Sequence, residues 1–122
     1  MKKIIAFTAI CAIPAALSAA PYPVAEPTGY DPYAADAIAR ADYAVAEERL
    51  VRRLDANGTD ISALLNLAAV MTETDRVARA SSLLEQVLEA ENVMLESASG
   101  QPVWSHDAAT AALRSRVTMG AR

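Results

Sequence analysis

Three residue types that make up a serine-hydrolase triad stand side by side near the C-terminus, as Ser105-His106-Asp107. In such a triad, a hydroxyl nucleophile, an imidazole base and an orienting carboxylate converge from separate elements of the fold. Adjacent residues cannot reach that geometry among themselves. We expect Ser105 instead to cap a C-terminal helix, with His106 facing solvent and Asp107 in the first turn. The sequence therefore predicts that the protein is not an enzyme.

The remaining residue types do not suggest a metal or cofactor site. His106 is the only histidine among the 122 residues, so a histidine-based zinc site is not expected. Cys11 is the only cysteine, and it lies inside an apolar N-terminal run. Lipidation of Cys11 is not expected, because Ile10 precedes it and the apolar run continues beyond it. We expect no bound metal and no cofactor.

Arg49, Arg52 and Arg53 form a basic stripe in the middle of the chain. Glu48 lies four residues before Arg52, which is the favourable spacing for an ion pair on one helix. Charged helix faces are usually solvated, and that interpretation is favoured here; the alternative is a site for an acidic partner or a phosphate. The formal net charge of the chain is −4, so nucleic acid is not an expected partner.

The chain begins as secretory signal peptides do, with a short positive start, an apolar core and a small-residue end over residues 1–20. Cleavage after Ala20 would place Pro21 beside the cut, whereas cleavage after Ser18 avoids the proline; both positions stay open. The apolar stretch is shorter than the ~20 residues that span a bilayer, and Pro14 interrupts it. We expect a periplasmic or secreted protein with no stable membrane insertion after cleavage.

Removal of residues 1–20 would leave one small domain without lysine or cysteine. This domain would contain nine arginines and fifteen acidic residues, which gives a net charge of about −6 with His106 neutral. No disulfide can form in this domain, so packing alone must stabilise it. Residues 21–30 carry three prolines and a glycine, a composition typical of an extended leader.

Apolar residues recur at three- and four-residue steps in the segments after this leader, which indicates amphipathic helices. The first helix is expected from Pro32 to about Arg40, because Asp31 can cap it and Pro32 suits a first turn. Residues 32–56 contain no strong helix breaker, however, and one continuous helix over this range stays open.

The residue types at the boundaries of the following helices indicate helix ends more clearly. The Asn57-Gly58 pair ends the helix that begins near Tyr43, and Asp60 is expected to cap the next helix. The Thr74-Asp75 pair is expected to form a turn and to cap a fourth helix.

The chain also repeats itself at a fixed offset of 34 residues, the distance from residue 41 to residue 75. Residues 41–56 align with residues 75–90, and the alignment matches alanine or leucine at positions 44, 46, 50, 54 and 56 of the first copy. A fixed period of this length indicates a repeat architecture. Such architectures usually provide binding surfaces rather than active sites.

Residues 61–92 contain a spaced pattern of large and small residues, Leu64-x-x-Leu67-Ala68-x-x-Met71 followed by Ala80-x-x-x-Leu84. This pattern resembles the tetratricopeptide repeat (TPR), whose period equals the offset between the two copies. Leu64, Met71 and Leu84 replace the aromatic residues that are usual in the family, and Asn92 stands where proline is preferred. The resemblance covers residues 31–92. It implies an all-α fold with about two TPR-like antiparallel helix pairs.

The resemblance also implies a place for a ligand. In TPR grooves the first helix of each pair faces the ligand, and an Asn at the place of Asn66 often bonds a peptide backbone. The alternative for this residue is that Asn66 is simply exposed. The resemblance predicts a partner-binding groove lined by Ser62, Leu65, Asn66, Ala69 and Glu73.

Residues 93–122 depart from the repeat. Gly100 and Pro102 fall where the first helix of a third repeat would run, and both residue types break helices. We expect a short hairpin or loop there, followed by a C-terminal helix that caps the exposed core. Trp104 is expected to anchor this segment to the helices; the alternative is an exposed residue at an interface.

Together, these features predict a secreted, TPR-like protein–protein interaction module that acts as an adaptor or assembly factor in the bacterial envelope. Two repeats are fewer than the three that usually make such an array stable. We therefore expect a protein or peptide partner, or a homodimer. The alternative is a self-associating structural or stress-related envelope protein without a ligand groove.

Overall fold

The computed structural model describes residues 4–5 and 31–120, and most of these residues are helical, in a largely all-α fold. Apart from residues 4–5, the predicted signal peptide over 1–20, its cleavage site and the leader over 21–30 lie outside the described residues. The elements are β1 (Ile4–Ile5), α1 (Ala35–Ala39), α2 (Tyr43–Ala56), α3 (Ile61–Glu73), α4 (Val77–Glu89), β2 (Met94–Ser97), β3 (Pro102–Trp104) and α5 (Ser105–Gly120).

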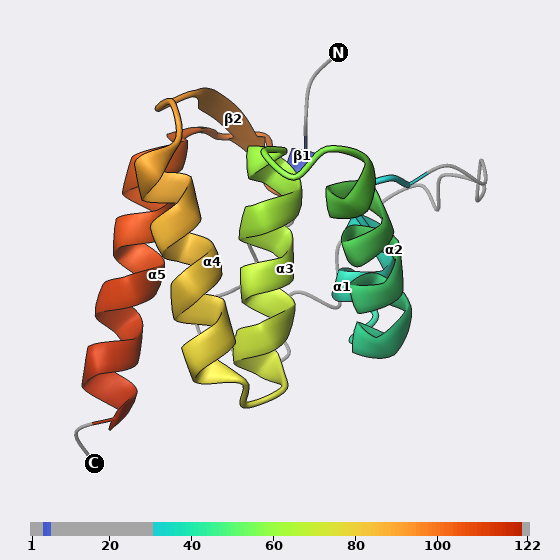
Figure 1. Ribbon diagram of the computed structural model, residues 1–122, viewed down its shortest axis with the longest axis horizontal. Coiled ribbons are helices and arrows are strands. Elements are labelled where there is room, and N and C mark those ends of the chain that lie inside the picture. The colour runs from blue at the N-terminus through green and yellow to red at the C-terminus, as the bar shows by residue number, and fades with distance from the viewer. Residues whose placement is uncertain (1–3, 6–30, 121–122) are drawn as a thin grey trace.

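The helices α2, α3, α4 and α5 stand side by side in chain order, and α1 lies behind α2 (Figure 1). Each of these four helices contacts the next one along the chain, and α1 packs on α2. The loops over 57–60 and 74–76 are short, so the helices that they join run in opposite directions. The hairpin of β2 and β3 lies at the same end of the molecule as the loop between α2 and α3 (Figure 1).

The central helix of the fold is α3. Every residue from Ser62 to Met71 is buried, and the helix contacts α2, α4, α5 and β1. Within that run only Ser62 and Asn66 are polar. A helix that is apolar on all sides is stable only when other elements surround it, so the composition of α3 explains its central position.

Two matching turns, one repeat period apart, follow α1 and α3. Ala41 and Asp75 both adopt a positive φ, 58° and 60° respectively. In each turn the amide of the next residue donates to the carbonyl five positions earlier, at 2.8 Å. A left-handed residue followed by this bond is the Schellman ending of a helix. Residues 32–56 therefore form two helices, α1 and α2, rather than one.

The predicted start of the first helix at Pro32 is wrong. Ala34 has a φ of 55°, and α1 begins only at Ala35. Asp31 still acts at this helix start, because its Oδ2 accepts a hydrogen bond from the Asp36 amide at 3.0 Å. The left-handed conformation of Ala34 keeps the preceding residues out of the helix.

The predicted boundary between α2 and α3 is confirmed. The helix α2 ends at Ala56, and Asp60 Oδ1 accepts from the Ala63 amide at 3.3 Å as the N-cap of α3. At the next turn the predicted cap within Thr74-Asp75 is wrong. Arg76 is the N-cap of α4, and its side chain makes no capping bond.

The C-terminal hairpin is present, since β2 and β3 pair in antiparallel register. Its turn contains Gly100 with a φ of 79°, a conformation that favours glycine. The helix α5 follows directly and packs on α4. The predicted cap of this helix by Ser105 is wrong, because the His106 amide donates instead to Asn92 Oδ1 at 3.1 Å. A side chain from the loop after α4 thus accepts a hydrogen bond from a backbone amide at the start of α5.

Candidate binding surface

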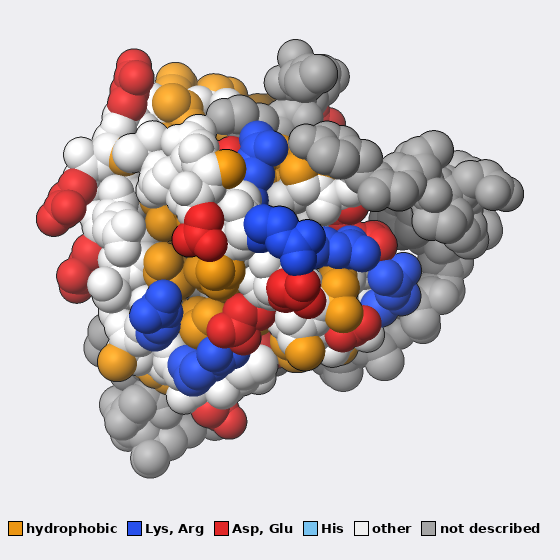
Figure 2. Space-filling model, turned by 45° about the vertical axis from the view of Figure 1, so that its right-hand side comes forward, with side chains coloured by type: hydrophobic (Ala, Val, Ile, Leu, Met, Phe, Trp, Pro, Cys, Tyr) orange, Lys and Arg blue, Asp and Glu red, His pale blue; other side chains and the backbone are white. Residues whose placement is uncertain are grey.

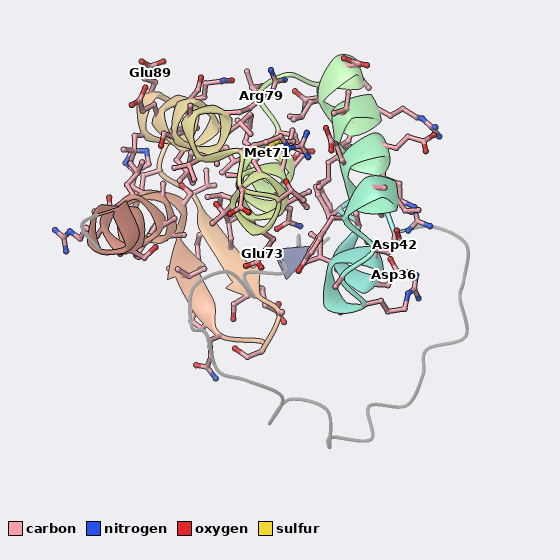
Figure 3. The ribbon with its side chains drawn as sticks, turned by 90° about the horizontal axis from the view of Figure 1, so that it is seen from below. Asp36, Asp42, Met71, Glu73, Arg79 and Glu89 are labelled. Atoms are coloured by element: carbon pink, nitrogen blue, oxygen red, sulfur yellow. The ribbon has the colours of Figure 1, made fainter. Side chains whose placement is uncertain are left out.

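The five residues predicted to line a groove share one face of α3, but this face is not open in the described chain. Ser62 and Asn66 are 0% exposed, Leu65 is 1% exposed and Ala69 is 6% exposed. Only Glu73 is exposed. Figure 3, which looks along the helices, places Glu73 on the side of α3 that faces the strands. This face is covered in the described chain because the apolar α3 is surrounded by other elements.

Two polar atoms inside this face have no hydrogen-bond partner among the described residues. Asn66 Nδ2 donates to the Tyr33 carbonyl at 2.9 Å, but Asn66 Oδ1 and Ser62 Oγ bond nothing in this part of the chain. A buried polar group left in this state costs about 1–3 kcal/mol. Because the two residues are four positions apart on one helix, the two atoms lie on the same side of α3.

The strand β1 lies between this helix and the hairpin. It pairs in parallel with β2, with Ile4 opposite Glu96 and Ile5 opposite Ser97, and it also contacts α3. The sheet order is therefore β1-β2-β3. Since β1 belongs to residues 1–20, the strand against α3 is part of the segment that export is predicted to remove.

A cleft of about 670 Å³ opens between the hairpin and the loop that joins α2 to α3. The sequence did not predict it, because its two walls are far apart along the chain and no local pattern marks their approach. The only local signal is the apolar run Val93-Met94-Leu95, which suggests a short strand. The walls include apolar Ile61, Val93, Met94 and Leu95 and acidic Asp60 and Glu96.

Ser105 and His106 join loops rather than forming a reactive pair. Ser105 Oγ accepts from the Val93 amide at 3.0 Å and donates to Asn92 Oδ1 at 3.2 Å, and Ser105 is fully buried. His106 Nε2 lies 2.8 Å from the Ala90 carbonyl oxygen. The ring is half-buried, so the expected solvent-facing position of His106 is wrong.

The arginine stripe is balanced by acidic side chains. The predicted ion pair of Arg52 with Glu48 is confirmed, with Nη2 2.6 Å from Oε1. Arg49 pairs with Asp36 of α1 at 3.1 Å. Figure 2 shows positive and negative side chains interspersed over the face it presents. This arrangement fits a solvated, ion-paired surface better than an anion site.

The third arginine of the stripe belongs to a cluster that joins three elements. Arg53 Nε donates to Asp60 Oδ2 at 2.9 Å, and Arg53 Nη2 donates to Tyr33 Oη at 2.9 Å. The guanidinium lies over the Tyr33 ring, 4.9 Å from its centroid, and Tyr33 Oη donates to Asp60 Oδ2 at 3.2 Å. Burial, together with the negative charge of Asp60, raises the pKa of Tyr33. The cluster stabilises the junction of α2 and α3.

The hairpin exposes an apolar pair. Trp104 is 44% exposed and Met94 is 51% exposed, and the two residues stand directly opposite each other on β3 and β2. The expectation that Trp104 anchors this segment in the core is therefore wrong. Trp104 is exposed instead, as in the alternative interpretation.

Among the residues that the structure describes, no three His, Cys, Asp or Glu side chains gather in a way that could hold a metal ion. Within the same part of the chain, no helix combines the length and the apolar character needed to cross a bilayer. The chain matches no protein-family model, no curated protein and no solved structure.

Proposed function

We propose that this protein is exported to the bacterial envelope and works there as a helical module that binds another protein. Its binding surface is the side of α3 that faces the strands, formed by Ser62, Leu65, Asn66, Ala69 and Glu73. Removal of residues 1–20 takes β1 away from this face. The face then lines a groove that is open to a polypeptide partner.

The backbone supports a repeat of helix pairs, as in the TPR family. The turns after α1 and α3 have the same left-handed residue and the same hydrogen bond, one repeat period apart. These matching turns support a common plan for the pairs α1–α2 and α3–α4, and in a TPR array the first helix of each pair faces the ligand. The predicted groove residues lie on one of these first helices.

The observation that carries the proposal is the pair of unpartnered atoms inside this face, Ser62 Oγ and Asn66 Oδ1, within the described part of the chain. Folded proteins satisfy nearly all buried polar groups, so a purely structural face would carry apolar residues at both positions. A polypeptide brings backbone donors and acceptors at regular spacing and can satisfy both atoms. Leu65 and Ala69 supply apolar area for its side chains.

The substitution Ser62→Ala separates a binding face from a structural one. Because the Ser62 hydroxyl has no partner among the described residues, its loss is expected to leave the free energy of unfolding unchanged or to raise it by up to ~1 kcal/mol. The same loss removes a hydrogen bond to the ligand and weakens partner binding about fivefold. Ser82→Ala, on the exposed side of α4, is the matched control and is expected to change neither quantity.

The measurement is affinity capture from periplasmic extract with the processed chain, quantified for the unaltered protein and both variants, beside urea unfolding of each. A partner held by the unaltered protein and by Ser82→Ala but weakened by Ser62→Ala supports the proposal. Equal capture by all three, or capture of no protein, contradicts it.

A self-associating envelope protein is the second candidate, and the exposed pair Met94 and Trp104 favours it. Two copies of the chain can cover these side chains by hairpin-to-hairpin contact. Trp104→Ser is then expected to dissociate the assembly while helix content stays the same. Sedimentation velocity at several concentrations decides the matter, since a monomer throughout the series rules this candidate out.

A further inference from the structure

We propose that the edge of β2 that faces β1 is a strand-acceptor site in the exported chain. It binds an extended segment of a second protein in parallel pairing, at the place that β1 occupies in the unprocessed chain. The partner segment is apolar and β-branched, with a basic residue beside it. This inference rests on the proposed function, because it requires the removal of residues 1–20.

The backbone of β2 uses alternate residues for its two edges. Toward β3, the Ser97 amide donates to the Gln101 carbonyl at 2.8 Å. Met94 and Glu96 belong to the other set of alternate residues than Ser97. Their backbone N–H and C=O groups therefore point toward the opposite edge. That edge is the one on which β1 pairs, with Ile4 opposite Glu96. Removal of β1 turns β2 from a central strand into an edge strand.

The outer edge of the hairpin, formed by β3, is protected against pairing with a further strand. Pro102 stands opposite Glu96, at a position where the backbone of β3 points away from β2. Its nitrogen has no hydrogen to donate, so a further strand cannot form a regular ladder there. Proline on an outer edge is one of the means by which sheets prevent unwanted pairing. The hairpin thus blocks the β3 edge and leaves the β2 edge available.

The surroundings of the β2 edge select the chemistry of the ligand. The adjacent cleft carries apolar Ile61 and Met94 and the acidic Glu96. An acidic side chain on the ligand would meet the like charge of Glu96, whereas a basic side chain is attracted to it. The strand β1 has the favoured character, since its two β-branched isoleucines follow two lysines in the sequence.

The β2 edge and the α3 face form one site, because β1 contacts both. A strand bound there meets the main chain of β2 on one side and the side chains of α3 on the other. Main-chain bonds of this kind give affinity, and side-chain contacts give specificity. A second copy of this chain, paired antiparallel through the same edge, would instead place acidic Glu96 near its own counterpart. A segment of a different protein is therefore the favoured occupant.

The test uses the protein recovered from the periplasm, with its mass measured to establish the removal of residues 1–20. The first probe is a synthetic peptide with the sequence of residues 1–10. The second is an unrelated peptide with two lysines followed by alternating valine and threonine. Both are expected to bind in calorimetry, and both are expected to slow hydrogen exchange at the Glu96 amide.

Two controls isolate strand pairing. Glu96→Pro removes the amide that faces the β1 edge and leaves the bonds to β3, so it is expected to weaken both peptides at least about fivefold. Glu96→Gln keeps the amide and is expected to change affinity less than Glu96→Pro. A peptide of residues 1–10 that carries Ile4→Pro and Ile5→Pro is expected not to bind the unaltered protein. This last control does not depend on the folding of any protein variant.

Several outcomes overturn the proposal. Recovery of the protein with residues 1–20 still attached means that β1 fills the edge. Binding of the first peptide alone means that the site serves only its own segment. Failure of both peptides, or binding without protection of the Glu96 amide, rejects the strand-acceptor site. The proposed function stands in these last two cases if the Ser62→Ala capture experiment supports it.

Discussion

At the scale of single residues, Asp60 joins three parts of the chain through one buried carboxylate. Its side chain is 0% exposed and pairs with Arg53, whose side chain is 32% exposed. It also accepts from Tyr33 Oη and from the Ala63 amide. A buried carboxylate is tolerated only when such partners replace its lost hydration. The junction of α2 and α3 therefore depends on this one side chain.

Asp60→Ala is expected to lower the free energy of unfolding by about 2–3 kcal/mol, because it removes a helix cap and leaves Arg53 without its carboxylate. Asp42→Ala is the matched control. Asp42 also caps a helix, but it is exposed and its Oδ1 lies 3.5 Å from the Val45 amide, so a loss of about 0.5–1 kcal/mol is expected. Urea unfolding of both variants measures the difference, and equal losses would contradict this account of Asp60.

Glu47 is a second residue whose charge matters, because it joins α2 to the start of α4. Its carboxylate accepts two bonds from the Arg76 guanidinium, and these bonds lower the pKa of Glu47. A carboxyl group with a lowered pKa contributes stability above the pKa of the unfolded chain, and this contribution disappears as the pH falls through the lowered pKa.

Glu47→Gln is therefore expected to be slightly less stable than the unaltered protein at neutral pH and equally stable at strongly acid pH. Urea unfolding at both pH values measures this. The effect is small, because both side chains are partly exposed to solvent. Glu48→Gln, which alters a more exposed ion pair within α2, is the control and is expected to show a smaller difference. A Glu47→Gln deficit that persists in acid would contradict the assignment.

At the scale of elements, the ends of α1 and α2 show where sequence reasoning succeeded and where it could not. Asn57-Gly58 and Asp60 marked a helix boundary with residue types that favour it, and the structure has that boundary. Ala41 is the left-handed residue after α1, a position where glycine is common. Alanine at this position does not indicate a helix end. The choice between one helix and two over residues 32–56 therefore needed the structure.

Ala41→Gly is expected to raise the free energy of unfolding by about 0.5–1 kcal/mol, because glycine adopts a φ of 58° without a steric penalty. Ala44→Gly, three residues later on the exposed side of α2, is expected to lower it by a similar amount. Thermal or urea unfolding of the two variants checks both signs. A loss of stability in both would mean that the turn at Ala41 is not as described.

Other element boundaries depend on contacts between residues distant in sequence. At the start of α5 the backbone amide of His106 donates to Asn92 rather than to Ser105. At the start of α1 the left-handed Ala34 keeps the preceding residues out of the helix. Local rules for caps consider only neighbouring residues, so they assigned both starts incorrectly. The hairpin was predictable because Gly100 and Pro102 are themselves unfavourable in a helix.

At the scale of the whole molecule, the resemblance to a repeat family identified a shared face of α3 but not what lies against it. Helical spacing is enough to place Ser62, Leu65 and Asn66 on one side. The pairing of Ile4 with Glu96 joins β1 to the hairpin strand β2, far away along the chain, and no local pattern encodes such a contact. The near absence of polar residues in α3 was the one available sign that this helix is enclosed.

Export is proposed to open a polypeptide-binding site bounded by α3 and the β2 edge. The most direct test compares amide hydrogen exchange in the unprocessed chain, made without export, and in the chain recovered from the periplasm. The Glu96 amide, which faces β1, is expected to exchange at least about tenfold faster in the processed chain. The Ser97 amide, bonded to Gln101 within the hairpin, is expected to stay protected in both. Equal protection of Glu96 in the two forms, or loss of protection at Ser97 together with Glu96, would contradict the account.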